Sequence, residues 1–101
     1  MSFQQYTPDN AKVFLESTDA IVLDIRDHAS YNAGHIPNAE HMTMQMLDHF
    51  CEKTSKEKPI LVCCYHGISS QSVAQYLVAK GFLTVISLIG GYAGWKNASN
   101  F

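Results

Sequence analysis

The sequence predicts a small three-layer α/β domain, with a mostly parallel sheet of about five strands flanked by helices. Short apolar runs rich in β-branched residues, at residues 20–25, 59–64 and 83–88, predict interior strands because they are too short for buried helices. Segments with helical spacing of apolar residues alternate with these runs. A short helical crossover joins the last two strands, so we expect them to be parallel neighbours. A chain of 101 residues has the size of one domain, and we expect residues 1–101 to form a single unit.

The first helix is predicted in "TPDNAKVFLES", directly before the first apolar strand. Thr7 is a suitable N-cap, and Pro8 suits the first helical position because its missing N–H would have no partner there. The apolar residues Ala11, Phe14 and Leu15 then follow with helical spacing.

A second helix is predicted in "MTMQMLDHFCEK", residues 42–53. Here Met46, Leu47 and Phe50 fall on one face, so we expect this face to pack against the sheet.

The clearest helix, residues 69–81, lies between the last two strands. Ser69 or Ser70 can cap its start, and Gly81 can end it, because glycine accepts the left-handed conformation common just after a helix. A last short helix is predicted over residues 92–98.

Composition and charge exclude several classes of function. The formal net charge is −2 and charged residues are scattered, so nothing favours nucleic acid as a partner. The longest mostly apolar stretch, residues 82–95, is interrupted by polar residues and glycines and is shorter than the roughly 20 residues that span a bilayer. The first residues carry neither a basic nor an apolar leader segment, and we expect a cytoplasmic protein without a membrane span.

Three cysteines are an odd number, which argues against a disulfide framework and for at least one free thiol. The neighbours Cys63 and Cys64 should point to opposite faces of their strand. We interpret Cys63 as a small core residue and Cys51 as a half-buried packing residue on its helix. Cys64, at the end of a strand that leads into a helix, is the candidate reactive thiol.

Residues 65–69 must turn the chain from strand to helix in a few steps. Gly67 is expected at positive φ, where glycine has no steric penalty. Such a loop tends to aim successive N–H groups inward as an anion-binding nest, and the helix N-terminus adds partial positive charge. A thiol at this rim should have a depressed pKa, and its thiolate should be the nucleophile.

A zinc site is the competing use for Cys63, Cys64 and His66, but their spacing matches no usual set of zinc ligands. We therefore expect no metal. A thiolate stabilised by the loop also needs no general base, which weakens that role for His66. Three further histidines, His28, His41 and His49, are interpreted as surface or satisfied polar residues.

Three segments of the chain resemble the signatures of the rhodanese family, in order and over nearly the whole length. "LDIRDHASYNAGHIPNAEHM" is similar to the first signature, Asp-x-Arg followed by Gly-His-Ile-Pro-x-Ala. "VCCYHGISS" is similar to the active-site loop, and "LIGGYAGW" to the closing Gly-Gly-x-x-x-Trp signature. The loop most resembles the short bacterial subgroup associated with glycerol-3-phosphate operons.

The resemblance implies a single-domain thiosulfate sulfurtransferase with the rhodanese-like fold. Cys64 would accept the outer sulfur of thiosulfate as a persulfide, release sulfite, and pass the sulfur to cyanide, a small thiol or a thioredoxin-like dithiol protein. No metal or organic cofactor is implied. The residues implied in substrate binding are those of the loop: Tyr65, His66, Gly67, Ile68, Ser69 and Ser70.

Outside the loop, the resemblance implies mainly structural roles. Asp24 and Arg26 are interpreted as an ion pair that fixes the loop. The remaining signature residues are interpreted as turn and packing residues: Gly34, His35, Pro37, Gly90, Gly91 and Trp95.

One departure from the family pattern concerns arginine. Many rhodaneses have an arginine at the position of Ser69, and related protein phosphatases have one at the position of Ser70. Without a bidentate guanidinium, phosphoryl transfer loses its main charge stabilisation, which disfavours a small cysteine phosphatase. A rhodanese-like binding module with weak or no turnover is the other alternative, although such modules commonly lack the cysteine that is present here.

Overall fold

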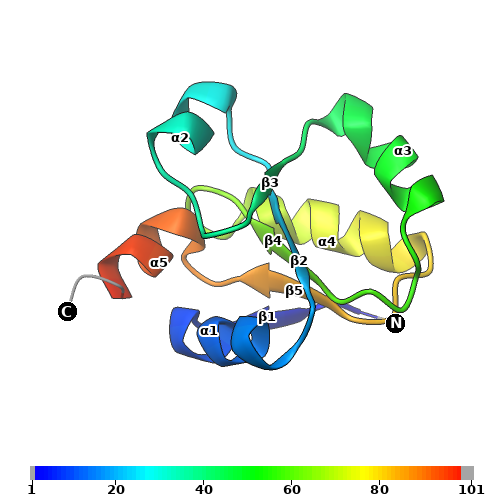
Figure 1. Ribbon diagram of the computed structural model, residues 1–101, viewed down its shortest axis with the longest axis horizontal. Helices are drawn as coiled ribbons and strands as arrows, with labels where there is room; N and C mark the ends of the chain where they lie inside the picture. Colours follow the sequence, from blue (N-terminus) through cyan, green and yellow to red (C-terminus); the bar gives the residue numbers. More distant parts are fainter. Residues whose placement is uncertain (1, 99–101) are drawn as a thin grey trace.

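The sheet is entirely parallel in a computed structural model of the chain, which describes residues 2–98. Its strand order is β1-β5-β4-β2-β3, so β4 occupies the centre (Figure 1). All four pairings are parallel, which confirms the expected α/β class and sheet. The strands are β1 (Gln4–Tyr6), β2 (Ile21–Asp24), β3 (Glu40–His41), β4 (Ile60–Cys63) and β5 (Val85–Leu88).

The helices form two outer layers. On one face, α3 and α4 cover a core that includes Leu23, Ile60 and Val62 of the sheet. On the other, α1 and α5, with Tyr31 of α2, cover a second core; Figure 1 shows α1 and α3 on opposite sides of the sheet. The helices are α1 (Pro8–Ser17), α2 (His28–Ala33), α3 (Met44–Lys53), α4 (Ser69–Ala79) and α5 (Gly91–Ala98).

Two helix ends follow the predicted capping chemistry. The Thr7 Oγ1 accepts a hydrogen bond of 3.3 Å from the Asn10 amide and so caps α1. At the end of α4, Gly81 has φ of 104°, and the Phe82 amide donates to the Leu77 carbonyl at 3.2 Å. This is the Schellman arrangement, which satisfies carbonyls that have no partner inside the helix.

The predicted cap of α4 was wrong. Ile68, rather than Ser69 or Ser70, occupies the N-cap position, and its side chain accepts no hydrogen bond. The Ser70 amide instead donates to the Cys64 sulfur at 3.3 Å. The thiol therefore takes the place that a capping side chain usually fills at this helix end.

The face of α3 was only partly predicted. Leu47 and Phe50 are buried, but Met46 is 47% exposed and the third buried residue of the helix is Cys51. Cys51 is only 3% exposed, so the expectation of half-burial was wrong. The reason is the helical spacing: residues 47, 50 and 51 fall on one stripe, and Met46 lies at its edge.

Two short strands and one short helix, β1, β3 and α2, were not located in advance because each lacks a continuous apolar run. The last helix begins at Gly91, one residue before the predicted start. Within residues 2–98, no helix combines the length and apolar character needed to cross a bilayer.

Candidate active site

Cys64 directly follows β4, the central strand of the sheet, and α4 begins at Ser69. The strands on both sides are parallel to β4, so their carboxyl ends meet at the same edge of the sheet. Asp24 pairs in register with Cys63, and Ser87 pairs with Val62. The thiol thus lies where ligands bind in parallel sheets, beyond the carboxyl ends of the strands.

The Cys64 sulfur is surrounded by hydrogen-bond donors of the loop and the first turn of α4. The Gly67 amide donates to Sγ at 3.1 Å and the Ser70 amide at 3.3 Å. The Ser70 hydroxyl lies 3.3 Å from the same sulfur. Cys64 is 3% exposed, so these contacts form in a largely desolvated setting where they are strong.

These donors change the acidity of the thiol. Burial by itself raises the pKa of Cys64 and is the largest single influence. Hydrogen bonds from the Ser70 hydroxyl and amide, and from the Gly67 and His66 amides, together outweigh burial and hold the pKa of Cys64 below its ordinary value. The influences are hydrogen bonds rather than neighbouring charges, as expected for a loop that works as an anion nest.

Gly67 has φ of 86°, the left-handed conformation that the sequence predicted. A Cβ at this position would lie 2.7 Å from the Gly90 nitrogen and 2.9 Å from the Leu88 oxygen. Both atoms belong to the backbone, so they have little freedom to move away. Glycine is therefore required for conformation and for space, and it brings its amide to the Cys64 sulfur.

Backbone amides at the start of α5 donate hydrogen bonds to the first residues of the loop. The Tyr92 amide donates to the Cys64 carbonyl at 2.7 Å, and the Ala93 amide donates to the Tyr65 carbonyl at 3.2 Å. Gly91 makes this approach possible, since a Cβ there would lie 2.4 Å from the Cys64 oxygen. The closing glycine signature thus fixes the first peptides of the loop.

The other predicted loop residues are exposed. The Tyr65 side chain is 45% exposed and its hydroxyl lies 3.2 Å from the Ser30 Oγ, while Ile68 is 76% exposed. His66 and Ser69 are exposed as well, and within the described residues the His66 ring makes no hydrogen bond to Cys64. Gly67 and Ser70, together with the backbone amide of His66, are thus the predicted binding residues that the structure brings to the sulfur.

Two functional contacts were missed from the sequence. The Gln71 Nε2 donates to the Gly67 carbonyl at 2.8 Å and steadies the loop from the helix. The Ser87 Oγ lies 2.8 Å from the Ser70 Oγ, which in turn lies 3.3 Å from the Cys64 sulfur. A serine inside the otherwise apolar β5 was the only available signal for the second contact.

Asp24 and Arg26 form the expected ion pair. The Arg26 Nη2 and the Asp24 Oδ2 are 2.7 Å apart, and the Arg26 Nε also donates to Asp24 at 2.9 Å. The guanidinium donates to the Gly34 carbonyl and lies 4.3 Å from the centre of the Tyr92 ring. Hydrogen bonding to Asp24 raises the pKa of Arg26. The pair therefore links β2, the segment after α2, and α5 around the loop.

The other cysteines lie in different surroundings. Cys63 is fully buried, and burial together with the nearby Asp24 carboxylate raises its pKa to about 12. Burial also raises the pKa of Cys51. In the described part of the chain all three cysteines are free, and no group of three or more His, Cys, Asp or Glu side chains could hold a metal ion.

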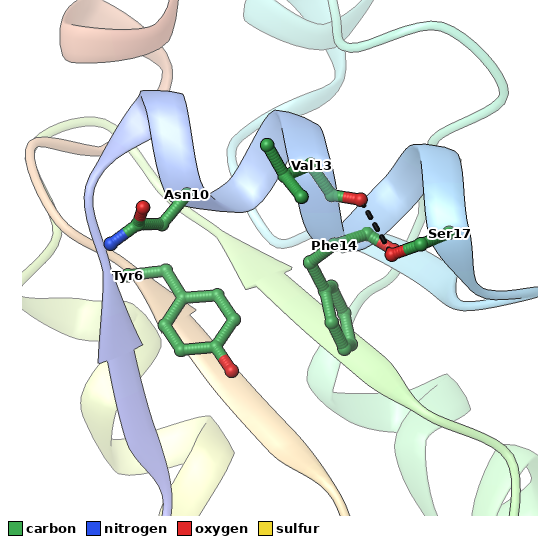
Figure 2. A pocket seen from close by; sticks show the side chains of 5 residues that line it. All are labelled: Tyr6, Asn10, Val13, Phe14 and Ser17. Atoms are coloured by element: carbon green, nitrogen blue, oxygen red, sulfur yellow. Dashed lines mark hydrogen bonds between the residues drawn. The ribbon is translucent and has the colours of Figure 1, made fainter.

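A hollow of about 390 Å³ lies over α1 and β1 and shares no lining residue with the loop (Figure 2). Tyr6 and Phe14 meet there edge to face, with ring centres 5.6 Å apart. The Ser17 hydroxyl on its rim donates to the Val13 carbonyl at 2.7 Å, which satisfies the proton of that hydroxyl. Nothing in this hollow resembles the donor set around Cys64. Its lining residues are Tyr6, Asn10, Val13, Phe14 and Ser17.

Comparison with curated proteins finds close relatives over almost the full chain. A protein of Coxiella burnetii named "Thiosulfate sulfurtransferase GlpE" is 50% identical over 96 residues, which are 95% of this chain and 90% of the relative. A protein of Pseudoalteromonas translucida with the same name is 40% identical over 97% of this chain and 93% of its own length.

Solved structures show the same architecture. The crystal structure of a rhodanese-like domain protein from Staphylococcus aureus superposes with a TM-score of 0.80 at 28% identity, over 92% of this chain and 91% of that one. The solution structure of a rhodanese-like domain from Anabaena gives a TM-score of 0.83 at 30% identity, over 94% of this chain and 74% of that one. The sequence profile of the family described as "Rhodanese-like domain" matches residues 7–98. With the loop, the glycine turn and the Asp24–Arg26 pair in place, the chain belongs to the rhodanese family.

Proposed function

We propose that this chain is a thiosulfate sulfurtransferase, a single rhodanese domain over residues 1–101, and that Cys64 carries the transferred sulfur. The observation that carries the proposal is the set of donors at the Cys64 sulfur, with the Gly67 amide at 3.1 Å and the Ser70 amide at 3.3 Å, which help to hold the pKa of this thiol below its ordinary value. The names of the relatives, which are 40% to 50% identical, support the same activity.

In the first step, the Cys64 thiolate attacks the outer sulfur of thiosulfate. A bond forms between Sγ and this sulfur while the sulfur–sulfur bond of thiosulfate breaks, and its electron pair leaves with sulfite. The Cys64 persulfide remains. The loop amides and the N-terminus of α4 attract both the anionic donor and the developing charge. Substrate-binding roles for Tyr65, His66, Gly67, Ile68, Ser69 and Ser70 belong to this proposal.

In the second step, a nucleophile attacks the outer sulfur of the persulfide and Cys64 leaves as the thiolate. Cyanide would give thiocyanate, and a small thiol or a thioredoxin-like dithiol protein would give a new persulfide. Sulfur moves between nucleophiles in both steps, so the chemistry requires no metal or organic cofactor. The dependence on a free thiol suits the reducing cytoplasm, which we propose as the location of the protein.

Two alternative functions, a binding module and a cysteine phosphatase, predict different results from the sulfurtransferase in one experiment. A binding module with weak or no turnover would not form the persulfide, and a cysteine phosphatase would hydrolyse phosphate esters. The positions at which related enzymes have an arginine hold Ser69 and Ser70 here, so phosphoryl transfer lacks a bidentate partner.

The test is intact mass spectrometry of the protein after incubation with thiosulfate. We expect an adduct of one sulfur atom that cyanide removes with formation of thiocyanate, and no adduct on Cys64→Ser. A wild-type protein without the adduct would favour the binding module. Hydrolysis of a phosphate ester that depends on Cys64 would favour the phosphatase.

A further inference from the structure

A chain of two buried hydroxyls lies beneath the Cys64 sulfur. The Ser70 Oγ lies 3.3 Å from Cys64 Sγ and 2.8 Å from the Ser87 Oγ. Ser70 and Ser87 are 0% and 1% exposed, so water does not compete for their hydrogen bonds. A buried hydroxyl on a strand whose other residues are apolar is costly unless a partner satisfies it.

We propose that Ser87 is a positioning residue for the Cys64 nucleophile, acting through the Ser70 hydroxyl. The inference rests on the proposed sulfurtransferase function and adds a residue from β5, which lies outside the loop and α4. Ser87 does not touch the reacting sulfur itself.

The direction of the protons follows from the partners of each hydroxyl. Within the described residues, Ser70 is the one hydrogen-bond partner of the Ser87 side chain, so the Ser87 proton has an acceptor only when Ser87 donates to Ser70. The Ser70 oxygen accepts from the neutral Cys64 thiol at 3.3 Å, but the thiolate has no proton to donate, so the Ser70 hydroxyl then turns its own proton to Sγ. A buried donor without an acceptor costs more than a partly satisfied acceptor, so this polarity is favoured.

Ser87 also removes a competing conformation of Ser70. Serine in the first turns of a helix commonly turns its hydroxyl toward a backbone carbonyl one turn earlier. The bond from β5 holds the Ser70 side chain at the sulfur instead. A hydrogen bond donated to Ser70 also polarises its O–H group and strengthens the bond to the thiolate.

The charged and titratable side chains around this end of the sheet do not interfere with the chain of hydroxyls. These side chains are Asp24, Arg26, Cys63, Tyr65, His66 and Tyr92. In the described residues none of these side chains hydrogen-bonds to Cys64 Sγ, Ser70 Oγ or Ser87 Oγ. The effect of Ser87 is therefore expected to pass through Ser70.

The same arrangement serves both steps of the transfer. In the first, it increases the fraction of Cys64 present as thiolate at neutral pH. In the second, Cys64 is the leaving group, and a thiol of lower pKa leaves faster. Loss of the Ser87 hydroxyl should slow turnover at saturating donor while leaving the KM for thiosulfate nearly unchanged, because the loop amides remain in place.

The test compares an isosteric pair at position 87. Thr and Val have nearly the same shape on a strand but differ in the hydroxyl, so we would compare Ser87→Thr, Ser87→Val and Ser87→Ala with wild type. The first readout is the rate of Cys64 alkylation by iodoacetamide as a function of pH, which requires no sulfur transfer. The second is the rate of persulfide formation by intact mass.

We expect Ser87→Ala and Ser87→Val to raise the apparent pKa of Cys64 and to slow its alkylation at neutral pH about fivefold, the worth of one hydrogen bond. Above this pKa the rates should converge with wild type. Ser87→Thr should resemble wild type. Val85→Ala, which removes a buried side chain from the same strand, should lower stability without moving the pH profile.

The double variant Ser70→Ala/Ser87→Ala tests whether Ser87 acts on Cys64 through Ser70. If Ser87 acts through Ser70, removing Ser87 changes nothing further once Ser70 is alanine. An unchanged pH profile in both Ser87→Ala and Ser87→Val overturns the inference, and so does a Ser87 effect that persists without Ser70. A wild-type protein that forms no persulfide overturns the proposed function instead, and the alkylation profiles still decide the role of Ser87.

Discussion

Cys63 and Cys64 are neighbours in the chain, but their thiols lie in opposite environments. Cys63 is in the core beneath α1 and α5, where burial raises its pKa to about 12. The Cys64 sulfur receives hydrogen bonds from Gly67 and Ser70 at the edge of the sheet, and its pKa is lowered. Cys64 lies directly after β4, and the alternation of successive side chains turns the two thiols to opposite sides, so that only the Cys64 sulfur meets the donors of the loop.

The first prediction follows from this contrast. Cys64→Ser should abolish sulfur transfer, because a serine hydroxyl is barely ionised at neutral pH and cannot hold a sulfane sulfur. Cys63→Ala should keep turnover and lower the free energy of unfolding by about 1 kcal/mol through a small void. Thiosulfate–cyanide assays and urea unfolding measure the two effects. An inactive Cys63→Ala beside an active Cys64→Ser would show that the wrong sulfur has been assigned.

The second prediction concerns the loop glycine. Gly67→Val should remove most activity and also lower stability, since its Cβ would meet the backbone of Gly90 and Leu88 below 3.0 Å and displace the amide that reaches Cys64. Gly81→Val is the matched control: Gly81 also has positive φ, but a Cβ there meets only the Lys56 side chain at 4.0 Å. It should lower stability and leave the thiosulfate kinetics of the folded protein unchanged. Normal thiosulfate kinetics in folded Gly67→Val would contradict the proposal that the loop amides bind the anion.

The third prediction concerns how Cys64 is activated. Alkylation of Cys64 should rise with pH through a pKa below the free-thiol value of about 8.5 and level off above it, because the thiolate reacts. His66→Ala should barely change this profile, since the His66 amide rather than its ring contributes to the lowered pKa. A pKa near the free value in wild type, or a marked rise in His66→Ala, would make the ring the activating partner.

The fourth prediction concerns alkaline stability. The pKa of Cys63 is raised to about 12 in the fold, so folding favours the protonated thiol. Its contribution to stability is complete below the unfolded value of about 8.5 and is lost as pH rises from there toward 12. The free energy of unfolding of wild type should therefore fall more steeply above about pH 8.5 than that of Cys63→Ala. Parallel pH profiles of the two proteins would show that Cys63 ionises as in the unfolded chain.

The fifth prediction contrasts two ion pairs. Asp24→Asn leaves the Arg26 guanidinium buried without its carboxylate and should cost about 3–5 kcal/mol, with loss of activity as the loop loosens. Asp19→Asn breaks the exposed pair with Lys58, whose separation of 2.8 Å is close to that of the buried pair, and should barely change stability. Thermal unfolding of both variants makes the comparison. Equal, small effects would mean that the Asp24–Arg26 pair does not support the fold.

Much of the protein was determined by the sequence alone. Apart from Asp24 and Ser87, the runs at β2, β4 and β5 are apolar on both faces, so the local pattern was enough to identify them as buried parallel strands. The positive φ of Gly67 and the position of Cys64 beside the loop amides were predictable as well, because a short strand-to-helix loop restricts which residues fit there.

Tertiary structure decided the features that depend on contacts distant in sequence. The very short β1 and β3 exist because neighbouring strands pair with them, and α4 needs no serine cap because the Cys64 sulfur accepts its Ser70 amide. Ser87 is the clearest example of a feature that the sequence alone could not reveal. In sequence it is one polar residue in an apolar strand, and only the parallel pairing of β5 with β4 places its hydroxyl 2.8 Å from Ser70. A hydrogen bond between residues far apart in the chain leaves no local pattern, because its geometry exists only once the layers have packed.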